Sequence, residues 1–161
     1  MKERFLFFGV LFLCGLAYAQ SADFVTELLQ TEKATFGQIC YFTAVHRGLV
    51  DESASIEEAL IVLKNREEVS ENAAAEVAAD YADAAYLFSK IWNVKGHLLF
   101  KLTKGHRRYA FKKFQKDRIV PVHADPQAFP SGVDILNLFT AGNAKYTVSN
   151  DNDSVSGATK K

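Results

Sequence analysis

Apolar residues in this chain recur every three or four positions, and no stretch shows the sustained apolar–polar alternation that is typical of strands. A spacing of three to four residues places apolar side chains on one face of an α-helix. The pattern predicts six helices: one that starts at Ser55, one over each of 80–94, 106–118 and 35–46, one over about 130–140, and a short leading helix over 22–32. The fold is therefore predicted to be all-α.

Residues that start and stop helices support these segments. Ser55 is followed three positions later by Glu58, which is the spacing of a capping box. Asp80 is a second candidate N-cap, and Pro130 suits the first turn of a helix. The expected helix ends carry residues that favour a turn or cannot continue a helix, namely Gly48, Gly96, Pro121 and Gly142.

Two parts of the chain align without gaps at an offset of 51 residues. Residues 58–63 align with residues 109–114, and each helix has a valine at its exit, Val69 or Val120. A loop then leads into another apolar helix in both copies, and a truncated first copy begins at Thr35. This predicts a repeating unit of helix, loop and helix whose copies bury their apolar faces against each other.

These units resemble the S-layer homology (SLH) module, in which one helix leads through a loop into a second. Residues 56–69 are similar to the first helix of that family, and residues 80–88 are similar to the second. Residues 106–121 with 130–139 look like another copy, so the resemblance covers roughly residues 35–142. It implies helix–loop–helix repeats packed into one small SLH-like domain, and a protein of the cell envelope.

The starts of the second helices differ from the family pattern. SLH modules carry a Thr-Arg-Ala-Glu type motif there, and its charged residues are associated with binding cell-wall polymer. The corresponding stretches here are Thr-Phe-Gly-Gln at 35–38, Asp-Tyr-Ala-Asp at 80–83 and Pro-Ser-Gly-Val at 130–133. None contains the arginine, so the resemblance transfers no site residue to this chain.

The first 19 residues have the three parts of a secretory signal peptide. Residues 1–4 are net positive, residues 5–16 are almost wholly apolar, and residues 17–19 read Ala-Tyr-Ala. The apolar run is too short to span a bilayer comfortably, and no other segment reaches about 18 apolar residues. We expect cleavage between Ala19 and Gln20, no transmembrane span in the mature chain, and export to the periplasm or cell envelope.

Two alternatives to cleavage stay open. The segment could be retained, or Cys14 could be lipidated, although Leu13 is not the small residue that a lipoprotein signal places before its cysteine. The remaining chain is predicted to form a helical repeat domain over 20–144. Residues 145–161 are polar and are predicted to be a disordered tail. The sequence does not give the oligomeric state.

The sequence holds no pattern typical of a catalytic, metal or cofactor site. It lacks a paired-cysteine motif, a Gly-rich phosphate loop and a His-Glu-x-x-His helix. No two of the four histidines have the i,i+4 spacing of helical metal ligands. The single cysteine of the mature chain, Cys40, is interpreted as a small buried apolar residue. We therefore predict no catalytic residue, no metal, no cofactor and no enzyme activity.

Charge is the clearest unusual feature of the sequence. The 161 residues include 19 basic and 19 acidic side chains, so the formal net charge is zero. Residues 20–94 hold 5 basic and 13 acidic residues, whereas residues 95–118 hold 9 basic residues and one acidic residue. The balance therefore hides an acidic first part and a short, strongly basic segment.

Three interpretations compete for the basic segment. It could pair with the acidic first part, bind an anionic partner outside the chain, or bind nucleic acid. Export and the core-like spacing of the nearby aromatic residues argue against nucleic acid. The partner would then be an envelope protein or an anionic envelope polymer, and the predicted contact residues are Lys104, Arg107, Arg108, Lys112, Lys113 and Lys116.

The sequence thus predicts an exported, non-enzymatic binding or structural module. The alternative is a periplasmic enzyme or small-ligand receptor with a pocket between repeats, lined by Tyr81, Tyr86 and Trp92. The helical spacing of these three residues favours core packing instead.

Overall fold

The computed structural model describes residues 23–95 and 106–156. Helices cover residues 23–30, α2 (Phe36–His46), α3 (Ile56–Asn65), α4 (Tyr81–Ile91), α6 (Arg107–Lys116) and α7 (Gly132–Ser156). The described residues contain no strand, only one isolated bridge between Thr35 and Ala78. The predicted all-α fold is confirmed. The predicted signal peptide at 1–19, its cleavage site Ala19–Gln20, and Lys104 lie outside the described residues.

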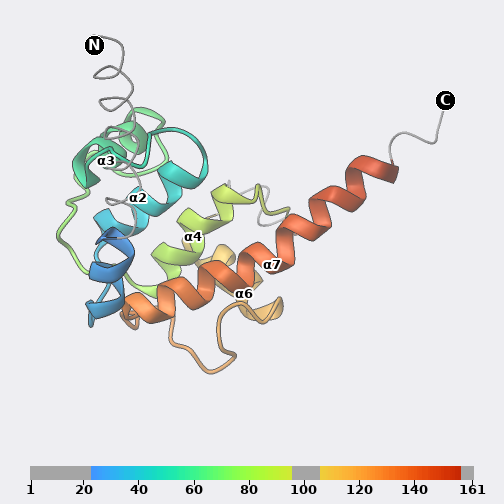
Figure 1. Cartoon of the computed structure of the whole chain (residues 1–161). Helices are drawn as coiled ribbons and strands as arrows, with labels where there is room; N and C mark the ends of the chain where they lie inside the picture. Colours follow the sequence, from blue (N-terminus) through green and yellow to red (C-terminus); the bar gives the residue numbers. More distant parts are fainter. Residues whose placement is uncertain (1–22, 96–105, 157–161) are drawn as a thin grey trace, which may run out of the picture.

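The helices are arranged as two central helices, α2 and α4, each with one outer helix. α3 packs on α2, α6 packs on α4, and α7 runs alongside α4 (Figure 1). Phe88 of α4 is fully buried at the centre, where its ring lies 6.0 Å from that of Phe42 and 5.7 Å from that of Phe139. Aromatic packing between α2, α4 and α7 therefore forms the core.

Local capping explains where the helices begin. Thr35 and Ser55 form complete capping boxes with Gln38 and Glu58, and Asp80 accepts from the backbone N–H of Asp83 at 2.8 Å. Each cap supplies an acceptor to an otherwise unpaired N–H of the first turn. The starts predicted from sequence thus agree with the structure to within two residues.

Hydrogen bonds link the starts of α2, α4 and α7 in a closed cycle. Phe36 donates its backbone N–H to Val77, Tyr81 donates to Ala128, and Gly132 donates to Thr31, at 2.7–3.0 Å. Each acceptor lies in the loop that precedes the next helix of the cycle. The three helix starts therefore hold one another in place, although they are about 50 residues apart in sequence.

A second layer of the cycle lies two residues earlier in each segment and lacks one bond. The N–H of Ala79 donates to Ala34, and the N–H of Ala34 donates to Pro130, both at 2.9 Å. All three residues are buried. Proline has no N–H, so the corresponding bond from Pro130 to Ala79 cannot form.

Four helices end at a residue with a left-handed backbone, and only one of these four residues is glycine. Gly48, Glu67, Asn93 and Arg118 all have positive φ, between 46° and 63°, and follow α2, α3, α4 and α6. The next residue bonds back to the last turn, as Glu68 does to Leu63 at 3.1 Å. This is the Schellman arrangement, which normally favours glycine because of its left-handed backbone.

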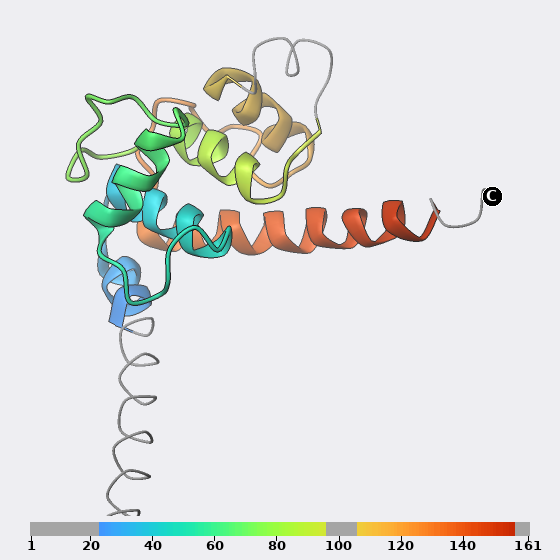
Figure 2. The same ribbon diagram turned by 90° about the horizontal axis from the view of Figure 1, so that it is seen from above.

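The predicted end of the last helix at Gly142 is wrong. α7 continues to Ser156, so the residues from Lys145 that were expected to be a disordered tail are helical at least that far. Gly142 lies against the Trp92 ring and is buried there, and Tyr146 is 9% exposed. The glycine thus serves close packing instead of ending the helix. The far half of α7 extends beyond the body (Figure 2).

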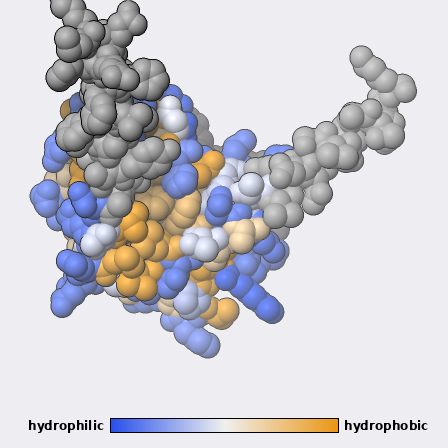
Figure 3. Space-filling view, in the orientation of Figure 1, coloured by the Kyte–Doolittle hydropathy of each residue, from blue (hydrophilic) through white to orange (hydrophobic). Residues whose placement is uncertain are grey.

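Apolar residues also gather on one face of the surface, near residues 23–30 and the start of α7 (Figure 3). Leu29 and Val133, which belong to these two segments, are both about half exposed. Among the described residues, no helix is both long and apolar enough to cross a membrane.

Candidate functional site

The predicted contact residues on α6 divide into inward and outward groups. Arg107 lies at the start of α6 and forms ion pairs with Asp80 and Asp83 of the α4 N-terminus, the latter at 3.3 Å. Lys113 pairs with Asp117 at 2.5 Å, and its ammonium lies 5.8 Å from the centre of the Tyr146 ring. These two cations are therefore already paired with carboxylates of the fold, although Arg107 itself is partly exposed.

The outward group is a row of three exposed basic residues, Arg108, Lys112 and Lys116. Their i,i+4,i+8 spacing aligns them on one side of α6, about 6 Å apart along the helix axis. We call them the outer basic row. Within the described part of the chain, no carboxylate is within ion-pair distance of Arg108 or Lys112, so both present their charge to solvent.

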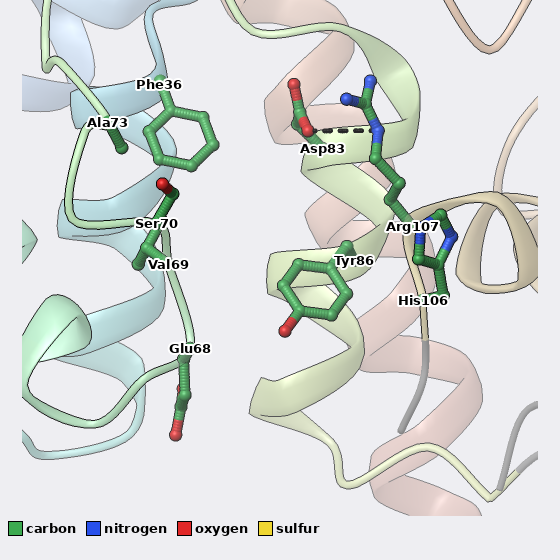
Figure 4. A pocket seen from close by; sticks show the side chains of 9 residues that line it. All are labelled: Phe36, Glu68, Val69, Ser70, Ala73, Asp83, Tyr86, His106 and Arg107. Atoms are coloured by element: carbon green, nitrogen blue, oxygen red, sulfur yellow. Dashed lines mark ion pairs between the residues drawn. The ribbon is translucent and has the colours of Figure 1, made fainter. Parts of the chain in front are cut away.

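A groove of about 570 Å³ separates the two helix pairs. Figure 4 shows its two walls. One is formed by Phe36, residues 68–70 and Ala73, the other by Asp83, Tyr86, His106 and Arg107. The wall residues come from α2, from the loop after α3, from α4 and from the start of α6. The groove therefore depends on how the two pairs pack together.

Each wall of the groove carries a carboxylate held by arginine. Glu68 pairs with Arg47 and Arg66. Burial opposes its ionisation, but the hydrogen bonds and charges of the two arginines outweigh burial and lower the pKa of Glu68. Across the groove, burial and the neighbouring Asp80 raise the pKa of Asp83, while Arg107 opposes them.

Of the three aromatic residues proposed to line a pocket, only Tyr86 lines this groove. Burial and the charge of Glu68 raise the pKa of its phenol, and Lys90 lies 4.8 Å from the centre of its ring. Trp92 is 6% exposed, its ring lies 5.6 Å from that of Tyr146, and it belongs to the core. Tyr81 is half-buried beside Asp134. The groove therefore differs from the pocket predicted from sequence.

Cys40 is fully buried, and burial raises the pKa of its thiol to about 12. A thiol that stays protonated is a poor nucleophile, because the thiolate is the reactive form. Within residues 23–95 and 106–156, no three His, Cys, Asp or Glu side chains are close enough together to hold a metal ion.

Sequence reasoning missed most of the groove. Phe36, Glu68 and Ser70 were not candidates, and Asp80 was considered only as a cap. The partners of Arg107 lie 24 and 27 positions earlier in the chain. One available signal was the Asp-x-x-Asp spacing at a helix start, which gathers two carboxylates and so favours a nearby cation.

No protein-family model, no curated protein and no solved structure matches this chain.

Proposed function

We propose that the protein is an exported, non-enzymatic binding module of the cell envelope, built from SLH-like helix pairs, and that it contacts an anionic envelope polymer through α6. The observation that carries the proposal is the outer basic row. Arg108 and Lys112 face solvent, whereas Arg107 and Lys113 on the same helix are paired with carboxylates.

The form of the row favours a polymer over a protein partner. Regularly spaced charges on one rigid helix suit a linear polyanion, which binds by releasing its counterions. Residues 107–116 add no exposed large hydrophobic side chain, so a contact made by α6 itself is mainly electrostatic.

The proposed setting rests on two features of the chain. The first is the signal-peptide pattern of residues 1–19. The second is the helix–loop–helix organisation, in which bonds recur at an offset of 51 residues. Glu67 to Lys64 is matched by Arg118 to Gln115, and Ala73 to Ser70 is matched by Ala124 to Pro121. Both features support an envelope repeat protein.

The test is salt-sensitive capture by an envelope polymer fraction that has been freed of protein. We expect the Arg108→Gln/Lys112→Gln variant to lose most of the binding that the parent shows at low salt. Lys33→Gln/Arg66→Gln removes the same charge from other sites and should bind like the parent. Equal capture of all three proteins would refute a role for the outer basic row, and capture only by the protein fraction would favour a protein partner.

The groove supports a second candidate, the binding of a small polar ligand. Tyr86 and Phe36 offer aromatic faces, and Arg107 and Glu68 offer polar groups on opposite walls. Ser70→Trp would fill the groove from an exposed loop position without altering α6. A soluble envelope extract that raises the melting temperature of the parent, but not of this variant, would support the groove.

A further inference from the structure

The outer helices α3 and α6 occupy corresponding places but carry opposite charges. Glu57 and Arg108 each follow their N-cap, Ser55 or His106, by two residues. Ile61 and Lys112 correspond in the same way. The face that presents Arg108 and Lys112 on α6 therefore presents Glu57 and Ile61 on α3, and all four side chains are exposed.

The α3 face combines acidic residues with an apolar hollow. Asp51, Glu57 and Glu58 are exposed there. Ile61 is 54% exposed and borders a hollow of about 480 Å³ that is also lined by Val50, Ala54 and Val62. We call this surface the acidic α3 face.

The α6 side of the molecule combines basic residues with an exposed apolar side chain. In the loop that follows α6, Val122 is 67% exposed. The backbone of this loop is held against α6, because the side-chain amide of Gln115 donates to the carbonyl oxygens of Val122 and Ala124, both at 3.2 Å. Each of the two surfaces thus has charges of one sign beside one exposed branched apolar side chain. We call this second surface the basic α6 face.

The two faces lie on opposite sides of a single molecule. α3 packs on α2, α2 packs on α4, and α4 packs on α6, so the central pair separates the outer helices (Figures 1 and 2). Complementary surfaces that cannot meet within one chain can still meet between two chains.

We propose that the acidic α3 face of one copy binds the basic α6 face of a second copy. The contact is head-to-tail, so every added copy leaves one acidic and one basic face exposed, and assembly continues until a ring closes. Charge complementarity selects this pairing, since α3–α3 and α6–α6 contacts would place like charges together. The contact uses the face proposed above for polymer, so an envelope polyanion and a second copy compete for α6.

The experiment measures self-association of the purified protein by sedimentation at about 50 mM and about 500 mM salt, where charges are screened over shorter distances. We expect association to weaken at least about tenfold at the higher salt. Glu57→Lys and Arg108→Glu should each weaken it by a similar factor, because each places like charges in the contact.

The combined variant Glu57→Lys/Arg108→Glu provides the matched control. It reverses both faces, so its copies are again complementary and most of the association should return. A mixture of the two single variants should also associate, since the reversed α3 of one fits the reversed α6 of the other. Circular dichroism of each variant separates loss of contact from loss of fold.

A parent protein that is monomeric at all concentrations would overturn the inference. So would association that survives Glu57→Lys while Arg108→Glu abolishes it, because the partner surface would then not be the α3 face. Polymer capture is read separately with Glu57→Lys, which keeps the outer basic row. If Glu57→Lys binds polymer but the parent does not self-associate, only this inference is refuted. If the parent self-associates but no polymer is captured, only the proposed function is refuted.

Discussion

The hydroxyl of Tyr146 donates to a carboxylate oxygen of Asp117 at 2.5 Å, and this bond ties the middle of α7 to the end of α6. Lys113 pairs with the same oxygen. The Tyr146 ring lies 5.6 Å from the Trp92 ring and 5.9 Å from the Phe114 ring. One tyrosine therefore joins two outer segments to the core.

Removing the Tyr146 hydroxyl should destabilise the fold while leaving its ring packing intact. A hydrogen bond to a charged group contributes about 1.5–3 kcal/mol. We expect Tyr146→Phe to lower the free energy of unfolding by roughly 1–2 kcal/mol, because Lys113 still pairs with Asp117. Urea unfolding measures the change. Tyr109→Phe, on the same pair of helices but away from this carboxylate, should have a much smaller effect.

The same carboxylate should make stability depend on acid pH. Burial opposes ionisation of Asp117, but the hydrogen bonds from Lys113 and Tyr146 outweigh it and lower its pKa. Arg47 and Arg66 likewise lower the pKa of Glu68. A folded-state pKa below the unfolded value of about 4 means that ionisation stabilises the fold. This stability is complete above about pH 5 and is lost as the pH falls through the lowered pKa values.

Asp117→Asn tests this dependence, because it removes one of the two groups. The variant should be less stable at neutral pH, and its unfolding free energy should fall less steeply below about pH 5. Glu71→Gln, at an exposed loop position, should keep the parent's slope. Parallel curves for Asp117→Asn and the parent would show that Asp117 contributes nothing to acid sensitivity.

The close contact of Gly142 with Trp92 predicts that even a methyl side chain at position 142 lowers the stability of the fold. A methyl group at this position would overlap the indole ring. We expect Gly142→Ala to destabilise the fold by about 1–3 kcal/mol, despite the better helix propensity of alanine. Trp92 is the only tryptophan, so its fluorescence should report the displaced ring directly. Asn137→Ala, exposed on the same helix, should change neither stability nor emission much.

The contrast between Gly142 and Ser55 indicates what local sequence can and cannot predict here. The Ser55 cap, its partner Glu58 and the apolar stripe that follows all lie within residues 55–63, so the helix start can be predicted from local sequence. A glycine near a helix end has two explanations, a stop or a close contact. The second depends on Trp92, 50 positions earlier in the chain, and no local pattern contains it.

The candidate site likewise combines features that local sequence predicts with features that depend on distant residues. The three residues of the outer basic row were among the six predicted contact residues, because the positive charge of residues 95–118 is visible in the sequence itself. That Arg107 is paired was not predictable, since Asp80 and Asp83 approach it only when α6 packs on α4. The groove is likewise a product of long-range packing.

The left-handed residues after α3 and α6 offer a gain in stability. Arg118 has a φ of 62°, a conformation that costs a residue with a side chain about 1–2 kcal/mol. Glycine relieves this cost but adds about 0.4–1 kcal/mol of entropy to the unfolded chain. We expect Arg118→Gly to raise the free energy of unfolding by about 0.5–1 kcal/mol. Arg118→Ala loses the same charge and keeps the strain, so it should show no such gain.

A substitution of Thr43, in the core, should also raise the stability of the fold, but for a different reason. Its hydroxyl is fully buried, and no residue in the described part of the chain bonds to it. Valine has nearly the same shape and the same branching at Cβ, so Thr43→Val removes the cost of an unpaired polar atom with little change in packing or helix propensity. We expect about 1 kcal/mol of added stability in urea unfolding. Thr140→Val, at an exposed position on α7, should bring no comparable gain. A loss of stability in Thr43→Val would mean that the hydroxyl has a partner, since only a broken hydrogen bond would make this exchange unfavourable.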